Sequence, residues 1–409
     1  MKPLETLLHL FNTRHQEIET WFEKQWQNLS PLPYFSCDLR HSNYKISIID
    51  TNLFPGGFNN LCNAFSRETS LAFAHYFKAQ HPQVKNIALF AEIHTRNKFY
   101  LQNLLKLQNL IIQAGLECRV TMPLPSWTNS QIKIDLSDSE SLTLCQPVMS
   151  GGELILNGHK TDLILSNNDL SSGVPEILSQ CTAPVVPPLK IGWHERSKSR
   201  HFTILCELID TFCQEFNLEH WLFCALSKTV DNITTDNLDP LAEAVDKLIN
   251  HIAEKFAAHG VTEEPYVFVK NDSGTYGLGV LPVKSGAEIL ELNRKKRDKL
   301  FARKGTNQIN RFLLQEGVPT YDTYSGHPVE AVIYGVGKQA VGGFFRFHSE
   351  KNAFESLNAP GMEFSCLCLH KIDEPHEAEF VRCDEKNNLV TAARFLTRFA
   401  ALAAAKEVQ

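Results

Sequence analysis

The sequence lacks the features that mark membrane proteins and nucleic-acid-binding proteins. None of its apolar runs approaches the ~18 residues that a membrane helix needs, and it contains no long basic run. Its formal net charge is −6 at pH 7. The N-terminal segment carries acidic and polar side chains where a secretory signal needs an unbroken apolar stretch. These absences predict a cytoplasmic protein that binds neither a membrane nor nucleic acid.

Motifs of several enzyme classes are also missing. No Gly-Lys-Ser/Thr sequence opens a helix, as in a Walker A loop, and there is no Gly-x-Ser-x-Gly elbow of a hydrolase. The histidines do not form the His-x-x-x-His pattern of a helical metal site. The 11 cysteines are scattered and odd in number, which favours reduced thiols over a disulfide framework.

The periodicity of apolar residues predicts a mixed α/β protein. A chain of 409 residues exceeds the usual size of one hydrophobic core, so we expect more than one domain. Apolar residues at three- and four-residue spacing predict helices over residues 4–26, 60–79, 97–114, 201–216, 239–258 and 389–406. Short apolar runs predict strands over residues 46–50, 86–90, 118–121, 266–270, 280–283, 312–316, 330–334 and 340–346.

The order of these elements suggests two regions. Strands and helices alternate in residues 1–180, which is typical of an open α/β sheet. Asn157-Gly158 lies between two apolar runs, 153–156 and 162–165, and predicts a hairpin because this pair tolerates positive φ. A proline-rich stretch then marks a boundary, and residues 181–409 form the second region.

A glycine-rich loop joins two predicted strands of the second region. Gly274, Gly277 and Gly279 follow Lys270, and the element that comes directly after them is a strand, not a helix. Such a loop can fold over a triphosphate like a lid, since glycine lets backbone N–H groups approach phosphate oxygens. The alternative is a mobile hairpin beside an exposed lysine.

Polar residues further along the chain follow in a set order. Gln315-Glu316 ends an apolar strand, Glu330 begins another, Arg346 ends a third, and Asn358 lies in a loop of small residues. The glycine-rich loop and this series of polar residues together resemble the sequence of ATP-grasp enzymes such as glutathione synthetase. The resemblance implies a first region that binds substrate, followed by a two-part nucleotide clamp. It also places Lys198, at a helix start, on the phosphates; the alternative is a solvated surface cation.

Several longer segments resemble one proteobacterial family of glutamate–cysteine ligases. The resemblance covers most of residues 45–365. It implies that ATP phosphorylates the carboxylate of glutamate, and that the amine of cysteine then attacks the acyl phosphate. The segments that carry it are residues 50–60, 92–97, 167–171, 192–202 and 357–362.

The resemblance assigns a role to each candidate residue. Arg346 and Lys270 are the catalytic candidates, and Glu330 and Asn358 are the candidate ligands of Mg²⁺. ATP is expected to contact Lys198, Lys270, Ser273, Gly274, Thr275, Tyr276, Gly277, Gly279, Gln315 and Glu316. One feature departs from glutathione synthetases: the late Glu-x-Asn that binds their metal ions is missing.

Four polar residues of the first region are candidate contacts for glutamate. Asp50, Asn52, Asn59 and Arg96 follow apolar strands, and ligands bind at the carboxyl ends of strands in open α/β sheets. The first three could instead cap turns, and Arg96 could be a surface or helix-start residue.

Three functions remain open from the sequence. The first is glutamate–cysteine ligation, with ATP, glutamate and cysteine as small-molecule partners. The second is an ATP-grasp ligase that joins another acid and amine. The third is a non-catalytic nucleotide-binding regulatory protein, which the missing Glu-x-Asn keeps in consideration.

Overall fold

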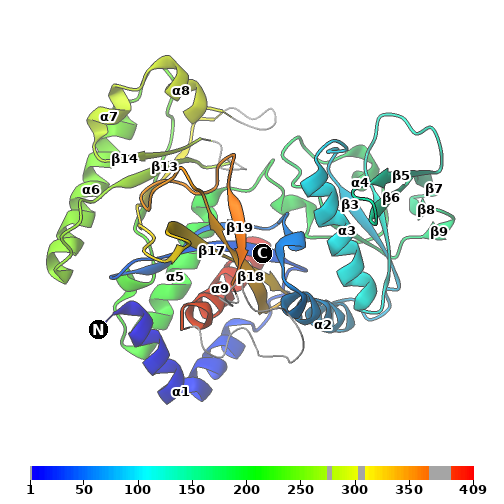
Figure 1. The fold of residues 1–409 in the computed structure, drawn as a ribbon, viewed down its shortest axis with the longest axis horizontal. Coiled ribbons are helices and arrows are strands. Elements are labelled where there is room, and N and C mark those ends of the chain that lie inside the picture. Colours follow the sequence, from blue (N-terminus) through cyan, green and yellow to red (C-terminus); the bar gives the residue numbers. More distant parts are fainter. Residues whose placement is uncertain (1, 274–278, 303–308, 368–387) are drawn as a thin grey trace.

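The fold is a mixed α/β arrangement, as predicted. The computed structural model describes all residues except 1, 274–278, 303–308 and 368–387. Three larger sheets are arranged along the long axis of the molecule, and a small three-stranded sheet lies at one end (Figure 1). None of the helices in the described part of the chain is both long and apolar enough to cross a membrane.

The central sheet is antiparallel and combines strands from both ends of the chain. Its order is β19-β18-β17-β1-β2, and β16 pairs with β17. Strands β17 and β18 are buried almost throughout, which fits their Val-, Ile- and Phe-rich sequences. The strands are β1 (Phe35–His41), β2 (Ile46–Asn52), β16 (Thr323–Tyr324), β17 (His327–Val336), β18 (Gln339–Phe347) and β19 (Glu363–Cys366).

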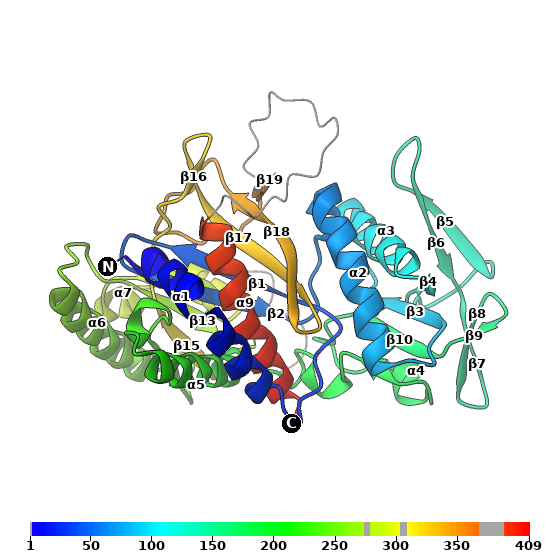
Figure 2. The same ribbon diagram turned by 90° about the horizontal axis from the view of Figure 1, so that it is seen from below.

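Three helices pack beside this sheet: α1 (Pro3–Gln25), α5 (Lys198–Phe216) and α9 (Asn388–Glu407). Helix α9 lies directly against the strands, and its many buried alanines allow helix and sheet to approach closely. Figure 2 shows α1 and α9 covering the strands. A cluster of aromatic rings joins the three helices: Trp21, Phe22, Phe212, Phe395 and Phe399.

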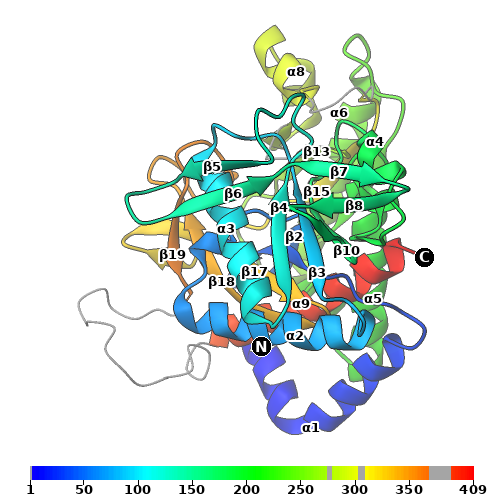
Figure 3. The same ribbon diagram turned by 90° about the vertical axis from the view of Figure 1, so that its right-hand side faces the viewer.

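A second, mostly parallel sheet lies beside the central one (Figure 3). Its order is β11-β10-β3-β4-β6-β5, and only β5 is antiparallel to its neighbour. Strand β3 is buried along nearly its whole length, as parallel strands usually are. Its strands are β3 (Asn86–Ala91), β4 (Glu117–Thr121), β5 (Gln131–Asp135), β6 (Ser141–Cys145), β10 (Leu163–Asn167) and β11 (Val185–Val186), and its nearby helices are α3 (Lys98–Gln113) and α4 (Glu176–Ser179). Helix α2 (Asn63–Gln80) packs against α3 and against strands β17 and β18 of the central sheet.

The third sheet is antiparallel and has its own core. Its order is β12-β15-β13-β14, and β13 and β14 pair across the glycine-rich loop as predicted. Helix α6 buries one apolar stripe against this sheet and ends at Gly260, whose φ is 65°. Its elements are α6 (Asp239–His259), α7 (Gly286–Leu290), α8 (Arg294–Leu300), β12 (Ser227–Val230), β13 (Val267–Asn271), β14 (Val280–Val283) and β15 (Phe312–Glu316).

The remaining elements are short. The small sheet contains β7 (Pro147–Ser150), β8 (Glu153–Leu156) and β9 (His159–Lys160). Three 3₁₀ turns, η1 (Phe58–Asn60), η2 (Leu189–Ile191) and η3 (His220–Leu222), complete the described elements.

Three details differ from the sequence-based expectations. Strands β1 and β2 join the late strands, so residues 35–52 do not belong to the sheet expected for residues 1–180. Asn157-Gly158 does form a hairpin turn, but this turn connects β8 to β9 and not to β10. Strand β10 instead pairs in parallel with β3. A run of apolar residues indicates that a strand forms there, but it does not indicate which other strand pairs with it. Cys206 and Cys224 form a disulfide, where reduced thiols were expected.

Candidate active site

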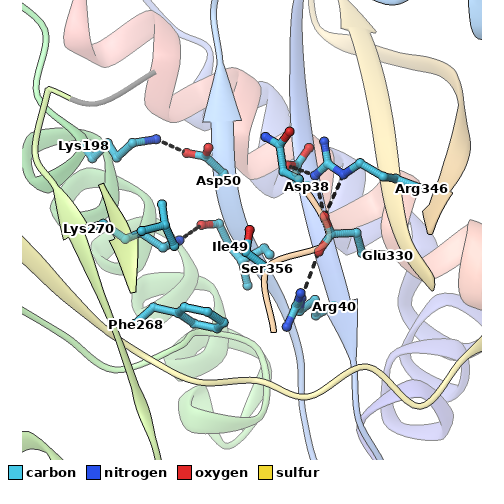
Figure 4. Close-up of a pocket in the computed structure, with 12 residues that line it drawn as sticks. Asp38, Arg40, Ile49, Asp50, Lys198, Phe268, Lys270, Glu330, Arg346 and Ser356 are labelled. Carbon is cyan, nitrogen blue, oxygen red and sulfur yellow. Dashed lines mark hydrogen bonds and ion pairs between the residues drawn. The ribbon is translucent and has the colours of Figure 1, made fainter. Parts of the chain in front are cut away.

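A cavity with many charged residues in its lining separates the central sheet from the four-stranded sheet (Figure 4). It contains about 490 Å³ not filled by protein atoms, part of which is open to solvent. Strands β13 and β14 and the start of α5 form one wall, and β1, β2, β17 and β18 form the other. Six of the predicted site residues meet in its lining: Asp50, Lys198, Lys270, Glu330, Arg346 and Asn358.

A row of alternating charges crosses the central sheet at this cavity. Glu330 on β17 pairs in register with Arg346 on β18, and Arg40 lies on the other neighbouring strand, β1. Glu330 Oε1 accepts hydrogen bonds from Arg346 Nε at 2.8 Å and Nη2 at 2.5 Å, while its Oε2 accepts one from Arg40 Nε at 2.9 Å. All three side chains are buried. Burial would raise the pKa of Glu330, but the two guanidinium groups outweigh it and lower that pKa.

Asp38 lies on β1 beside this row. Its Oδ2 accepts a hydrogen bond from Arg346 Nη2, so Arg346 contacts two carboxylates. The pKa of Asp38 is raised to about 6, mainly by burial, with Arg346 opposing and the neighbouring Glu330 and Asp50 adding to the shift. Asp38 therefore attracts a proton more strongly than an ordinary aspartate.

Lys198 and Asp50 form an ion pair on the opposite side of the cavity. Lys198 is the first residue of α5, as predicted, and its Nζ lies 2.5 Å from Asp50 Oδ1. Burial would raise the pKa of Asp50, but Lys198 and Lys270 outweigh it and lower the value to about 2. Asp50 is therefore ionised at neutral pH.

Lys270 projects from β13 into the same space. Its Nζ donates to the Ile49 carbonyl at 2.7 Å and to Gln315 Oε1 at 2.6 Å, and no described carboxylate pairs with it. Burial lowers the pKa of Lys270 to about 8, although the nearby Asp50 opposes this shift. The lining thus has one positive charge in excess, from four cations (Arg40, Lys198, Lys270 and Arg346) against three carboxylates (Asp38, Asp50 and Glu330).

A second pocket lies where α5 begins and β13 ends. Its lining includes Ser273, the one member of the loop segment 273–277 that the structure describes. Asp272 links the loop to α5, since its carboxylate accepts from Ser199 N at 2.6 Å and from Ser199 Oγ at 2.8 Å. Such contacts satisfy free N–H groups at the helix start. Gly279 is described and has a φ of 66°, whereas Gly274, Thr275, Tyr276 and Gly277 lie outside the described residues.

Several predicted site residues do not line the cavity. Gln315 reaches it only through Lys270, and Glu316 is fully buried with Lys45 Nζ 2.5 Å from its carboxylate. Asn52 caps a turn, because its Oδ1 accepts from Phe54 N at 2.9 Å. Asn59 and the exposed Arg96 line neither pocket. Their substrate roles stay predictions.

Sequence reasoning missed Asp38 and Arg40, although a signal was available. In β1 the apolar residues Phe35, Cys37 and Leu39 alternate with polar ones, which is the period of a strand with one polar face. That polar face supplies two side chains of the cavity.

A buried network behind Lys198 was also missed. Glu407, in the last turn of α9, accepts from Arg196 Nε at 2.9 Å and hydrogen-bonds to His201 Nδ1. Arg196 Nη1 donates to the Thr51 carbonyl at 3.0 Å, next to Asp50. The network therefore supports the helix start and the strand end that carry the Lys198–Asp50 pair.

The described residues do not form an evident magnesium site. No group of three or more His, Cys, Asp or Glu side chains among them could hold a metal ion. Asn358 lines the cavity, but both oxygens of Glu330 already accept hydrogen bonds from guanidinium groups. A metal ion at Glu330 would therefore compete with two buried arginines for the same carboxylate.

Comparison with known proteins identifies the family. The family described as GshA, glutamate–cysteine ligase, matches residues 9–408. The chain belongs to the glutamate–cysteine ligase family. This outcome confirms the resemblance drawn from the sequence.

One solved structure agrees with this family assignment. A protein of Methylobacillus flagellatus KT, assigned as a γ-glutamylcysteine synthetase, is 36% identical, with a TM-score of 0.88 over 100% of this chain and 96% of its own. D-alanyl-alanine synthetase A of Vibrio cholerae O1 is 10% identical over 77% of this chain and 81% of its own, and its TM-score of 0.35 is too low to support an argument. No curated protein matches significantly.

Proposed function

We propose that this glutamate–cysteine ligase family member joins the γ-carboxylate of L-glutamate to the amine of L-cysteine. ATP is consumed, and γ-glutamylcysteine, ADP and phosphate are released. The observation that carries the proposal is the family match over residues 9–408. The reaction is the first step of glutathione synthesis.

The nucleotide clamp is proposed to be of the ATP-grasp type. Two antiparallel sheets face each other across the cavity, and a glycine-rich loop joins β13 to β14. A polyphosphate fits the positive excess of the lining. Lys270 suits it best, since a charged amine held only by neutral oxygen atoms gains most from an arriving anion.

Activation of the carboxylate follows from the charges in the cavity. A carboxylate is a poor electrophile, and phosphorylation turns its oxygen into a good leaving group. Catalysis of phosphoryl transfer consists largely of positioning and charge stabilisation. Lys270 and Lys198 stabilise negative charge on the transferred group, and Arg346, whose Nη1 has no described partner, is placed to bind an oxygen of the acyl phosphate.

Magnesium remains a prediction that follows from the reaction type. A Mg²⁺ ion would offset charge on the phosphates of ATP. The roles proposed for Lys198, Lys270 and Arg346 rest on the charges of these side chains in the lining of the cavity.

The proposal is tested by product analysis with defined substrates. With ATP, glutamate and cysteine, we expect ADP and γ-glutamylcysteine in equal amounts, and much less ADP when either amino acid is left out or replaced. Equal turnover with unrelated acid and amine pairs would refute the assignment of substrates.

A pair of variants locates the reaction in the cavity. Lys270→Gln removes the unpaired cation and should abolish ATP turnover in a folded protein. Lys284→Gln is the matched control, because this lysine lies exposed just after β14, and Glu264 is its one ion-pair partner among the described residues. Normal turnover by Lys270→Gln would refute the placement of ATP.

A further inference from the structure

We propose that Asp38 is the base that accepts a proton from the ammonium group of cysteine, so that its nitrogen can attack the acyl phosphate. This inference rests on the proposed function and adds a catalytic residue to it. Asp38 lies on β1, in the wall of the cavity that also carries Arg346 and Glu330.

The hydrogen bonds of the three carboxylates in the cavity single out Asp38. Glu330 has both oxygens bound to guanidinium groups. Asp50 forms an ion pair with Lys198, and the same oxygen accepts from Thr51 N at 3.1 Å. Asp38 uses only Oδ2, and its Oδ1 accepts no hydrogen bond from any described residue. Only Asp38 therefore combines a free oxygen with no lysine partner.

The charges around Asp38 favour proton acceptance. Burial disfavours the ionised form of Asp38 most strongly, Arg346 from β18 stabilises that form, and the negative charges of Glu330 on β17 and Asp50 on β2 disfavour it further. The resulting pKa of about 6 leaves Asp38 ionised at neutral pH and more basic than Asp50, whose pKa is about 2. A base works best when its pKa lies near the working pH.

Arg346 fixes the position of the proposed base. It binds Asp38 through Nη2 and Glu330 through Nε and Nη2. Arg346, which is proposed to bind the acyl phosphate, thus also holds the proposed base Asp38 next to it. This arrangement brings the base to the point where the carbon–nitrogen bond forms.

The proposed step balances in atoms and charge. The cysteine nitrogen arrives as –NH₃⁺, and the amide product keeps one N–H. The carbon–nitrogen bond forms while the bond between the acyl carbon and the phosphate oxygen breaks, and the phosphate leaves with the electron pair. Asp38 takes the first proton from the nitrogen, which frees the lone pair that attacks, and the leaving phosphate takes the second.

Replacing cysteine with hydroxylamine distinguishes proton acceptance by Asp38 from the binding of ATP and glutamate and from the formation of the acyl phosphate. Hydroxylamine enters uncharged near neutral pH, so it forms γ-glutamyl hydroxamate by giving a single proton to the leaving phosphate and needs no base. We therefore expect Asp38→Asn to lower kcat with cysteine by about a hundredfold or more, while hydroxamate formation from ATP, glutamate and hydroxylamine is largely kept.

Asp50→Asn is the matched control for this experiment. It removes the carboxylate that pairs with Lys198, which is proposed to act on ATP, so both nucleophiles should lose rate alike. If Asp38→Asn also slows both alike in a folded protein, Asp38 acts only through Arg346 and the proposal is wrong. Normal cysteine turnover by this variant refutes it as well.

A measurement on the unmodified enzyme covers the case in which Asp38→Asn does not fold. The cysteine rate should fall as pH drops through about 6, whereas the hydroxylamine rate at constant free-base concentration should not. Equal pH dependence for the two nucleophiles contradicts the proposal. If the unmodified enzyme forms neither product, it is the proposed function itself that fails.

Discussion

Lys270 provides the sharpest test of how the cavity binds ATP. Its pKa of about 8 lies well below the ordinary 10.5 because the amine is buried. If only the charged form binds the polyphosphate, the competent fraction falls from about nine-tenths at pH 7 to about one-tenth at pH 9, and kcat/KM for ATP falls about tenfold.

Lys270→Arg changes the titration and keeps the positive charge. Arginine stays protonated across this range, so its pH profile for ATP should lack the loss seen in the unmodified enzyme. The assay measures ADP formation at saturating glutamate and cysteine from pH 7 to 9. The ratio of the two enzymes at each pH cancels the titration of the substrates.

The expected ratio of variant to unmodified enzyme rises about tenfold over this range. A constant ratio would mean that Lys270 does not titrate near pH 8 or does not bind ATP. Either result would refute the charge argument for the cavity.

Three further predictions concern stability and binding. Lys270→Met should abolish activity yet raise the free energy of unfolding at pH 7 by up to about 3 kcal/mol, since a buried lysine with a lowered pKa costs stability while it is charged; chemical denaturation measures this. Glu407→Gln should cost about 3–5 kcal/mol, because Arg196 and His201 lose a buried anion. Burial would raise the pKa of Glu407, but Arg196 and the hydrogen bond with His201 outweigh it and lower the value to about 2, so its contribution is full above its unfolded pKa and is lost as pH falls towards 2; acid denaturation should be less steep in the variant. Asn52→Ala should cost about 1 kcal/mol from the lost turn hydrogen bond and leave the KM for glutamate unchanged; a raised KM would restore its substrate role.

The sequence predicted the residues of the cavity better than the partners of its strands. Lys198, Lys270 and Arg346 were identified by local features: a helix start, a strand end before a glycine-rich loop, and a resemblance in spacing. The helix start and the strand end each lie within a few residues in the chain, so periodicity and motifs can reveal them, whereas Arg346 was identified by its place in a longer series. All three side chains line the cavity.

The parts that escaped prediction depend on contacts between distant segments. Asp38 acts beside Arg346, 308 residues later, and Glu407 holds Arg196 across 211 residues. No local pattern specifies such pairs. Burial is a second reason why the site could not be fully predicted. Glu316 was expected to contact the nucleotide, but its side chain is buried in an ion pair with Lys45. Whether a polar residue faces a ligand or a buried partner depends on packing.

The central claim is that ATP activates the γ-carboxylate of glutamate for attack by cysteine. Glutamate labelled with oxygen-18 in that carboxylate tests it directly, because the leaving oxygen of an acyl phosphate ends in inorganic phosphate. We predict one labelled oxygen in each phosphate released during γ-glutamylcysteine formation. Phosphate without the label would contradict the account.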